Sequence, residues 1–348
     1  MTSATATREL VRTFRSMASD IELRVVDPRP GAERSLDRAT ESIQAVARHL
    51  TRFEATSALS RANRSPQAWH QVPDELVDAV GAAEQAYRLT GGLFDPRVLD
   101  VLLAWGYDRT FDDVLASLTD PAGLRPVGRA ESGRPVVGPP AAGGVATSVV
   151  GGRAASARPP WQPTVLPAAG GLGLVHLDGS PIDLGGIGKG LAVRRAALEL
   201  AGAGAAVLVD AGGDEWLGGA GPDGDGWKVG VEDPHGGDDP VLVLSVSDLG
   251  CATSSTRRRR WTAGGRPVHH LVDPRTDAPG GAGLAAVTVL HTDPAWAEVW
   301  SKSLFLAGAI EVAAQAHVRD LAAAWVTEDG QVHVSAAMEP HVLWRAAR

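Results

Sequence analysis

The chain has 348 residues, of which 44% are hydrophobic and 21% are charged, a composition typical of a soluble globular protein with an ample core. Its formal net charge of −8 disfavours wholesale binding to nucleic acid or to an anionic membrane. The single cysteine, Cys251, excludes an internal disulfide and a cysteine zinc site.

The N-terminal stretch lacks the apolar segment of a secretory signal, and the chain has no run of about 18 apolar residues. We therefore expect no transmembrane segment and a cytoplasmic location. The first predicted element is a strand in residues 14–26, where apolar and polar side chains alternate. Ser35 is the predicted N-cap of a helix that carries apolar residues at helical spacing as far as Leu50. A second helix is predicted over residues 74–89.

Residues 121–163 are rich in Pro, Gly, Ala and Ser and show no sustained period. We interpret them as a flexible insertion within a single domain that spans residues 1–348. Several strands are predicted in the second half of the chain. They are expected in residues 205–214, 227–234, 242–248 and 284–290.

Asp293 and Pro294 are good N-cap and N1 residues for a helix that continues to Gln315. Residues 325–334 predict a hairpin, in which Asp329 and Gly330 suit a type I′ turn. Strands and helices are mixed without a regular βαβ alternation. The pattern therefore predicts an α+β fold rather than a doubly wound sheet.

The segment IDLGGIGKGLAVRRA, residues 182–196, joins a carboxylate, a cluster of glycines and a lysine to a predicted helix. It fails the P-loop pattern, because Asp183 stands where the first glycine is needed and Gly190 where Ser or Thr is needed. It fails GxGxxG at Leu191. Exposed loop N–H groups and the positive end of a helix beginning near Lys189 still favour an anion. The alternative is a tight strand-to-helix turn with a solvated lysine.

This segment resembles the DLGGIAKGYAVDRA signature of the ApbE family, the FAD:protein FMN transferases. Seven other segments are similar to family segments in the same order, and the match spans most of the chain outside residues 121–163. They are FRSMASDIEL, RFEATSALSRAN, TGGLFDPRVLDVLLAWGYD, VDAGGD, ATSSTRRRRW, HHLVDPRT and WAEVWSKSLFLAG. One such match would be weak, but the ordered set is specific.

The resemblance implies an ApbE-like mixed sheet with packed helices. It also implies an enzyme that moves the FMN phosphoryl group from FAD to a Ser or Thr hydroxyl of a target protein and releases AMP. That chemistry needs a held pyrophosphate, positive charge on the reacting oxygens and a base for the hydroxyl. By resemblance, FAD is bound by Met17, Phe53, Leu93, Phe94, Asp95, Asp183, Lys189 and Val272.

Within that set, the resemblance implies that Asp183 accepts hydrogen bonds from the adenosine part and that Lys189 lies close to the phosphates. His270 is the candidate for assisting deprotonation of the acceptor hydroxyl, a role that suits a group tuned near neutral pH. The alternative is a structural histidine that bridges backbone groups beside a turn.

The magnesium site that the resemblance implies is altered in this chain. The family uses an aspartate, a threonine four residues later on the late helix, and an oxygen from the glycine-rich loop, here near Gly186. In this sequence the two helix positions are Glu298 and Lys302. Glutamate can bind Mg²⁺, whereas protonated lysine cannot be a ligand. Either the two form an ion pair on the helix surface of a protein without metal chemistry, or a catalytic Lys302 ammonium replaces the metal and neutralises the pyrophosphate directly.

Other positions also depart from the family pattern. Ala18 and Asp277 stand where the family has glycine, and Arg194 stands where it often has aspartate. The arginines at 257–260 form either a solvated face or a patch that attracts phosphates or an acidic target protein.

Two further functions stay open at this point. One is a FAD-binding protein without transfer activity, acting as a flavin carrier or regulator. The other is a FAD pyrophosphatase, in which water replaces the protein hydroxyl. A Rossmann dehydrogenase is disfavoured, because the GxGxxG pattern fails. The sequence leaves the target protein and the oligomeric state open.

Overall fold

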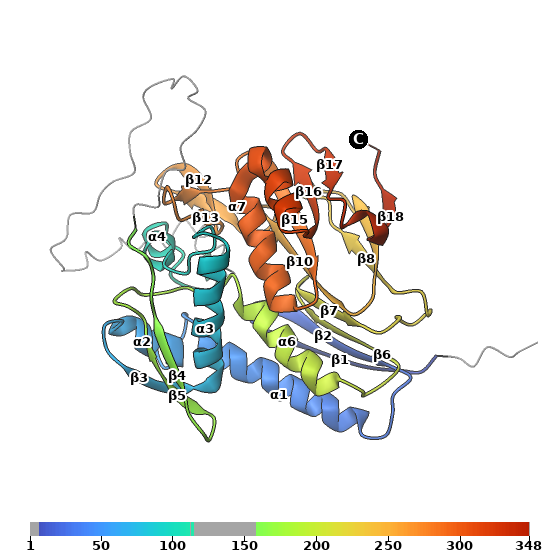
Figure 1. Ribbon diagram of the computed structural model, residues 1–348, viewed down its shortest axis with the longest axis horizontal. Helices are drawn as coiled ribbons and strands as arrows, with labels where there is room; N and C mark the ends of the chain where they lie inside the picture. Colours follow the sequence, from blue (N-terminus) through green and yellow to red (C-terminus); the bar gives the residue numbers. More distant parts are fainter. Residues whose placement is uncertain (1–6, 112, 115–157, 348) are drawn as a thin grey trace, which may run out of the picture.

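The computed structural model describes residues 7–111, 113–114 and 158–347. Its helices are α1 (Ala32–Leu50), α2 (Ala58–Arg64), α3 (Asp74–Leu89), α4 (Leu99–Ala104), α6 (Gly188–Leu200), α7 (Pro294–Val318) and the 3₁₀ turn η1 (Glu339–His341). Its strands are β1 (Glu9–Ser16), β2 (Ser19–Val26), β3 (His70–Pro73), β4 (Thr164–Pro167), β5 (Leu172–His176), β6 (Ala206–Ala211), β7 (Glu215–Gly218), β8 (Trp227–Val231), β9 (Leu242–Val246), β10 (Leu249–Ser255), β11 (Arg260–Ala263), β12 (Arg266–His269), β13 (Val272–Asp273), β14 (Ala278–Pro279), β15 (Leu284–His291), β16 (Ala322–Thr327), β17 (Val332–Val334) and β18 (Val342–Arg345). Figure 1 shows how they are arranged.

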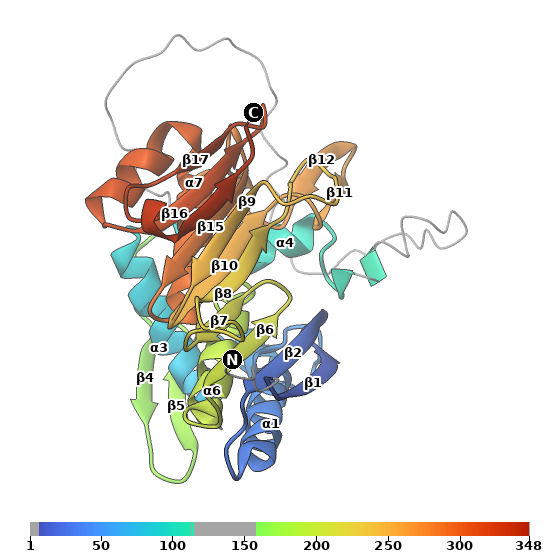
Figure 2. The same cartoon turned by 90° about the vertical axis from the view of Figure 1, so that its right-hand side faces the viewer.

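An eight-stranded sheet with the order β1-β2-β6-β7-β10-β15-β16-β17 forms the centre of the fold. In Figure 2 it runs from β1 and β2 near the bottom to β16 and β17 near the top. The pairings between its described strands are all antiparallel. The predicted α+β class is therefore confirmed, and the sheet is antiparallel rather than mixed in direction.

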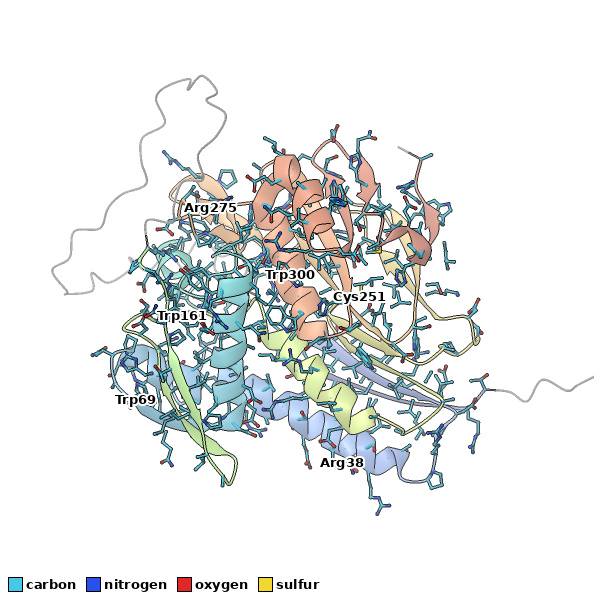
Figure 3. All side chains as sticks on the ribbon, in the orientation of Figure 1. Arg38, Trp69, Trp161, Cys251, Arg275 and Trp300 are labelled. Atoms are coloured by element: carbon cyan, nitrogen blue, oxygen red, sulfur yellow. The ribbon has the colours of Figure 1, made fainter. Side chains whose placement is uncertain are left out.

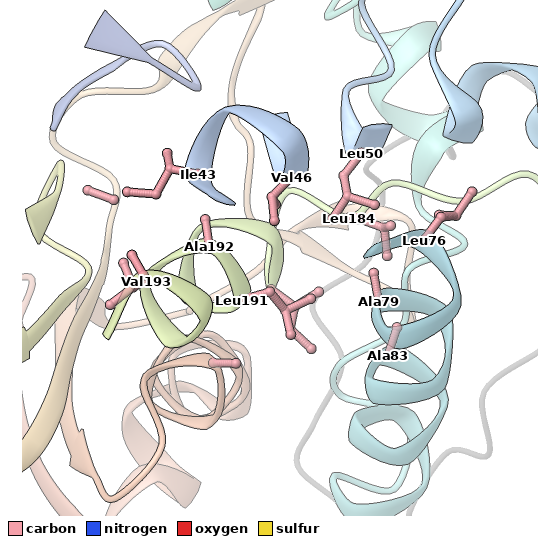
Figure 4. Packing of buried hydrophobic residues seen from close by; sticks show 14 of the residues in the cluster. Ile43, Val46, Leu50, Leu76, Ala79, Ala83, Leu184, Leu191, Ala192 and Val193 are labelled. Atoms are coloured by element: carbon pink, nitrogen blue, oxygen red, sulfur yellow. The ribbon is translucent and has the colours of Figure 1, made fainter. Parts of the chain in front are cut away.

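Helices α1, α6 and α7 cover one face of this sheet (Figure 1). The strands fit this layer because successive side chains point to opposite faces. On β2, Leu23 belongs to the core under the helices, whereas Val26 belongs to the core on the other side. Figure 4 shows Ile43 and Val46 of α1 above Ala192 of α6, and these three side chains are buried. The long helices thus hold the glycine-rich loop, which begins α6, against the sheet.

The other face of the large sheet is covered by a three-stranded sheet of order β18-β9-β8. The core between them is built mainly from aliphatic side chains of both sheets. It includes Ala206, Leu217, Val231, Leu242, Leu244, Val246, Leu290 and Val326. Cys251 on β10 is buried in the same core (Figure 3).

The first predicted strand is a hairpin instead of one strand. β1 and β2 pair from Glu9↔Val26 to Ser16↔Ser19, so that only Met17 and Ala18 lie in the turn. Both have positive φ, 51° and 55°. Two central residues with positive φ define the turn that best fits the twist of a hairpin, but Asn and Gly are its usual residues. The sequence Met-Ala therefore gave no turn signal.

Two local predictions, the N-cap of α1 and the turn type of the β16–β17 hairpin, differ from the structure. Helix α1 begins at Ala32 after Gly31, which has φ 95°, so Ser35 lies inside the helix and is not its N-cap. The hairpin of β16 and β17 is confirmed. Its turn is not type I′, since Gly330 has positive φ but Asp329 does not.

Helix α7 begins as predicted. The Asp293 side chain accepts a hydrogen bond from the N–H of Ala295 at 2.9 Å, and Pro294 occupies the first turn. The helix bends at Gly308, whose φ of 77° lies outside the helical region. Arg194 of α6 pairs with Asp293 at 2.7 Å and so joins the two helices at this end.

Part of the predicted insertion, residues 121–157, lies outside the described residues. No helix among the described residues is long and apolar enough to cross a membrane.

Candidate functional site

A cavity of about 480 Å³ lies where the β1–β2 turn, the end of α1, the glycine-rich loop and α7 meet. Six of the predicted site residues line it, although they come from distant parts of the sequence. They are Met17, Phe53, Asp183, Lys189, His270 and Lys302.

A second cavity, of about 20 Å³, shares Asp183, His270 and Lys302 with the first. It is lined by the remaining predicted residues except one, namely Leu93, Phe94, Asp95, Gly186 and Val272. The exception is Glu298, which is 6% exposed and lies one helical turn before Lys302 on α7. The fold therefore brings the predicted site residues into one region.

An aromatic wall closes one side of the large cavity. Phe53, Tyr107 and Phe111 line it, with ring centroids 5.8 Å apart for Phe53 and Tyr107 and 6.2 Å apart for Tyr107 and Phe111. The Arg52 guanidinium lies between two of these rings, 4.3 Å from the centroid of Phe53 and 4.6 Å from that of Tyr107. Such a wall suits a flat ring system, since stacked aromatic groups gain energy beyond the area they bury.

Asp183 is held by Arg52 at the edge of this wall. Arg52 Nε donates to Asp183 Oδ2 at 2.5 Å, and Asp183 Oδ1 accepts the N–H of Gly185 at 2.8 Å. Arg52 Nη1 donates to the carbonyl of Tyr107 at 2.7 Å, whereas its buried Nη2 has no hydrogen-bond partner among the described residues. A buried donor without a partner is costly, so Nη2 is a group that an incoming oxygen would satisfy.

Lys189 lies in the first turn of α6 and is paired. Its Nζ donates to Asp214 Oδ2, and the Asp214 carboxylate is 4% exposed. The N-cap residue of this helix, Ile187, supplies no capping side chain. The N-terminus of α6 therefore offers the positive end of a helix to the cavity, next to a lysine whose charge is partly neutralised.

Glu298 is buried against the same helix end instead of lying on the surface. Its Oε2 accepts the N–H of Gly190 at 2.8 Å. Burial and the nearby Asp214 raise the pKa of Glu298 to about 7. Among the described residues no ion pair joins it to Lys302, so of the two alternatives the surface ion pair of these residues is wrong.

Lys302 extends across the glycine-rich loop. A Cβ placed on Gly186 would lie 2.1 Å from Lys302 Nζ, 2.7 Å from Cε and 3.0 Å from Cδ. The lysine stem therefore rests on a backbone position where any side chain would collide with it. Burial lowers the pKa of Lys302, while the charges of Glu298 and Asp183 act in the opposite direction.

His270 lines both cavities and is held by the backbone of Arg259. Its Nδ1 lies 3.4 Å from the Arg259 carbonyl, which can only accept, so Nδ1 carries the hydrogen and Nε2 is left as an acceptor. Burial, followed by the charges of Arg259 and Lys302, lowers the pKa of His270 well below its ordinary value. A neutral imidazole near pH 7 can accept a proton.

Asp95 lines the small cavity, but its carboxylate is already occupied. Arg97 donates to it through Nε at 3.0 Å and Nη2 at 2.8 Å. Asp273 and Arg275 repeat this arrangement, with Nε and Nη2 at 2.9 and 2.7 Å (Figure 3 labels Arg275). These bidentate pairs fix the chain on both sides of the small cavity.

The arginines at 257–260 divide between two environments. Arg257 and Arg258 pair with Glu232 at the surface. Arg259 lines the large cavity, beside His270. The expectation of a solvated face holds for the first two, whereas Arg259 adds positive charge to the cavity.

Acidic residues lie below Lys189, on the sheet. In the register of the sheet, Glu215 of β7 lies opposite Asp210 of β6 on one side and opposite Cys251 of β10 on the other. Burial, followed by the charges of Asp210 and Asp214, raises the pKa of Glu215 to about 8. Its buried Oε2 has no hydrogen-bond partner among the described residues.

The site does not fit a magnesium ion between Gly186 and Glu298. The Lys302 ammonium occupies the space against Gly186, and the Glu298 carboxylate is bonded to a backbone N–H. In the described part of the chain, no three His, Cys, Asp or Glu side chains are grouped to hold a metal ion. Magnesium needs several oxygen ligands in near-ideal octahedral geometry, which an ammonium in the same space prevents.

Sequence reasoning missed Arg52, Tyr107 and Asp214. Arg52 directly precedes Phe53, and its guanidinium stacks on the rings of Phe53 and Tyr107. A single arginine in a loop forms no sequence motif that would predict this contact. Asp214 ends the segment VDAGGD, and a single aspartate after two glycines does not indicate a lysine partner. Its partner Lys189 is distant in the sequence, so only the fold could show the pair.

Comparison with known proteins adds a family and a fold. A model of the ApbE family matches residues 17–325. The FAD:protein FMN transferase of Treponema pallidum is 34% identical over 140 residues, which cover 37% of this chain and 39% of that protein. The protein of the same name from Rhodobacter capsulatus is 28% identical over 303 residues, 79% of this chain and 50% of that protein. These matches thus span half or less of the relatives' own length.

A solved structure, the ApbE protein of Thermotoga maritima, is similar in fold. It superimposes with a TM-score of 0.69 at 21% sequence identity and covers 96% of this chain and 99% of that one. At this identity the likeness establishes the fold alone.

Proposed function

The chain belongs to the ApbE family, and we propose that it is a FAD:protein FMN transferase. It would move the FMN phosphoryl group of FAD to a Ser or Thr hydroxyl of a target protein and release AMP. The relatives that carry this name support the proposal.

The observation that carries it is the combination of two environments in one cavity. FAD consists of two flat ring systems joined by a pyrophosphate. The cavity offers the aromatic wall of Phe53, Tyr107 and Phe111 and, in the same space, Lys189 and Lys302. Stacking would hold a ring, while the lysines and the N-terminus of α6 would hold the phosphates.

His270 would serve as the base. The acceptor oxygen forms a bond to the FMN phosphorus, and the bond between that phosphorus and the bridging oxygen breaks. AMP leaves with the bridging oxygen and its electron pair, and the hydroxyl proton goes to His270 Nε2. The lowered pKa keeps the His270 ring neutral near pH 7, so that Nε2 is present as an acceptor, but it also makes the ring a weaker base than a histidine tuned near neutral pH.

The other predicted residues would bind FAD. Lys189 would contact the phosphates as a point charge, and Asp183 would use its remaining acceptor capacity toward the adenosine part. Met17 would touch a ring from the β1–β2 turn. Asp95 would act through its backbone and its place in the lining of the small cavity, since its carboxylate is engaged by Arg97.

The test is incubation with FAD and a peptide that carries an acceptor threonine, followed by chromatography of AMP and FMN and mass spectrometry of the peptide. Transfer predicts AMP together with a peptide that gains the FMN group. Free FMN with AMP would instead indicate a pyrophosphatase, and intact bound FAD a carrier or regulator.

A His270→Asn variant sharpens the test. It should lower AMP release by about 10²–10³-fold, because the proton loses its acceptor, while FAD binding stays near the wild-type level. Unchanged AMP release in this variant would show that His270 takes no part in the reaction.

The cytoplasmic location stays a prediction, which cell fractionation would test.

A further inference from the structure

Lysine is rare in this chain, and its few copies have different surroundings. The sequence contains three lysines, Lys189, Lys228 and Lys302. Lys189 is paired with Asp214, and Lys228, which is 38% exposed, is paired with Asp225 at 2.9 Å. Lys302 has no ion-pair partner within 4.0 Å among the described residues.

The structure provides a fitted place for Lys302. Its stem lies on Gly186, where an added Cβ would approach Nζ to 2.1 Å. Its ammonium lies at the junction of the two cavities, because the lining of both includes Lys302. The glycine-rich loop therefore accommodates this side chain in addition to leaving backbone N–H groups accessible.

An ammonium removed from water gains most from an anion if no carboxylate neutralises it already. Glu298 is the nearest candidate on α7, but its carboxylate is bonded to Gly190. The groups that face Lys302 from other elements are Asp183 of the loop, Arg259 before β11 and Lys189 of α6. Together with Glu298 these groups are two carboxylates and two cations, and among the described residues neither carboxylate forms an ion pair with Lys302, so its ammonium stays available to an anionic ligand.

We propose that the Lys302 ammonium is a built-in cation for the FAD pyrophosphate, so that phosphoryl transfer in this chain proceeds without a divalent metal ion. This inference rests on the proposed function. Lys302 supplies no atom to the products. It donates hydrogen bonds to a pyrophosphate oxygen and stabilises the negative charge that grows on the bridging oxygen as AMP leaves.

The experiment begins with wild-type protein dialysed against EDTA until metal analysis finds no divalent cation. AMP release from FAD in the presence of the acceptor peptide is then measured in EDTA and in excess Mg²⁺, and FAD binding is followed by flavin fluorescence. We expect the two rates to agree within about twofold, because the stabilising charge belongs to the protein.

The variant Lys302→Met keeps an apolar stem against Gly186 and removes the charge. It should lower AMP release by about 10²–10³-fold, as expected for the loss of a donor to a developing negative charge. FAD binding in EDTA should weaken about tenfold, for the loss of a charge-assisted hydrogen bond. Lys228→Met removes an exposed lysine remote from the cavity and should leave both quantities unchanged.

Three results are decisive. A wild-type protein that is inactive in EDTA and restored by Mg²⁺ would overturn metal independence and leave the proposed function intact. Lys302→Met with the wild-type rate in EDTA would overturn the role of Lys302. No AMP release by the wild type under any condition would overturn the proposed function itself. If Lys302→Met does not fold, the comparison of wild-type rates with and without Mg²⁺ decides alone.

Discussion

The two lysines of the cavity differ in how their positive charges are compensated. At the start of α6, Lys189 is paired with the buried carboxylate of Asp214. On α7, Lys302 has a glycine under its stem and no ion-pair partner among the described residues. The first charge is positioned and partly neutralised before any ligand arrives. The second is held by the shape of the loop, and the charges of Glu298 and Asp183 stabilise it without forming an ion pair.

This difference shows how one protein can use separate lysines to bind a ligand and to stabilise the charge that develops during its reaction. A paired lysine costs less to bury than an unpaired one, but it gives an incoming phosphate a weakened attraction. An unpaired lysine is costly to bury, which is reflected in the lowered pKa of Lys302, and an anion relieves that cost when it binds. We expect Lys189 to contribute mainly to placing FAD and Lys302 mainly to the charge that develops during transfer.

Among substitutions that leave both lysines in place, the largest effect should follow from filling the space under Lys302. Gly186→Ala would force Nζ away from its place, and since a lysine end is flexible, the side chain can swing out without disturbing the backbone. AMP release should then fall about 100-fold, as for loss of the charge itself. The free energy of unfolding should change by less than about 1 kcal/mol. Chromatographic assay and chemical denaturation measure the two effects.

Gly81→Ala is the matched control for this substitution. Gly81 lies inside α3, and a Cβ there would meet only Val165 Cγ2, at 3.7 Å. The control should keep the wild-type rate and gain up to about 1 kcal/mol of stability, as expected for alanine in a helix. If Gly186→Ala also kept the wild-type rate, the contact between the loop and Lys302 would have no part in the reaction.

The second prediction removes the ion-pair partner of Lys189, so that this lysine is unpaired like Lys302. Asp214→Asn leaves the Lys189 ammonium without its carboxylate partner, so the protein without FAD should lose about 2 kcal/mol of stability. FAD should then raise the melting temperature more than it does in the wild type, because the ligand satisfies a charge that is otherwise unpaired. Thermal melts with and without FAD measure both.

Asp225→Asn breaks the exposed pair of Lys228 and Asp225 and serves as control. Exposed ion pairs contribute about 1 kcal/mol or less, so its melting temperature should stay close to that of the wild type with and without FAD. An Asp214→Asn protein that behaved like this control would mean that Lys189 is not neutralised by Asp214 in solution.

Local signals accounted for much of the fold that sequence reasoning predicted correctly. Asp293 and Pro294 marked the start of α7, because the cap and the first helical turn involve neighbouring residues. The β1–β2 hairpin was missed for the opposite reason. Met17 and Ala18 adopt positive φ without glycine or asparagine, and the surrounding strands impose this conformation.

The resemblance to the ApbE family marked positions that residue types alone did not. Ala18 and Asp277 stand where the family has glycine, and both have φ of 55°. The backbone conformation is thus the one glycine adopts most readily, although the residue differs. Unlike glycine, Asp277 has a side chain, and this side chain forms an ion pair with Arg158.

The candidate site was predictable as a set of residues but not as a set of contacts. Spacing on α7 correctly placed Glu298 and Lys302 one turn apart, yet it could not show that Glu298 bonds to Gly190 of another helix. The same holds for Arg52 on Asp183 and for Lys302 on Gly186. Each of these contacts joins distant segments, so it depends on how the layers pack.

The last prediction concerns the pH dependence of stability and the acidic residues beneath Lys189. The pKa of Glu215 is raised from 4.5 to about 8 by burial and by Asp210 and Asp214, so the folded protein holds a proton that the unfolded chain has lost. The stabilisation from this group is therefore fully present below pH 4.5 and is lost as the pH rises toward about 8.

Glu215→Gln keeps the shape of the side chain and stays neutral at every pH. Its stability should match the wild type near pH 4.5 and exceed it by a growing margin as the pH rises toward about 8, where the wild-type carboxyl must ionise beside two other acids. Denaturation curves across this range measure the difference. A difference that does not change with pH would mean that Glu215 is ionised and solvated throughout. A difference that grows with pH would show that the sheet below Lys189 holds a neutral acid, so that Asp214 is left as the carboxylate that pairs with the lysine.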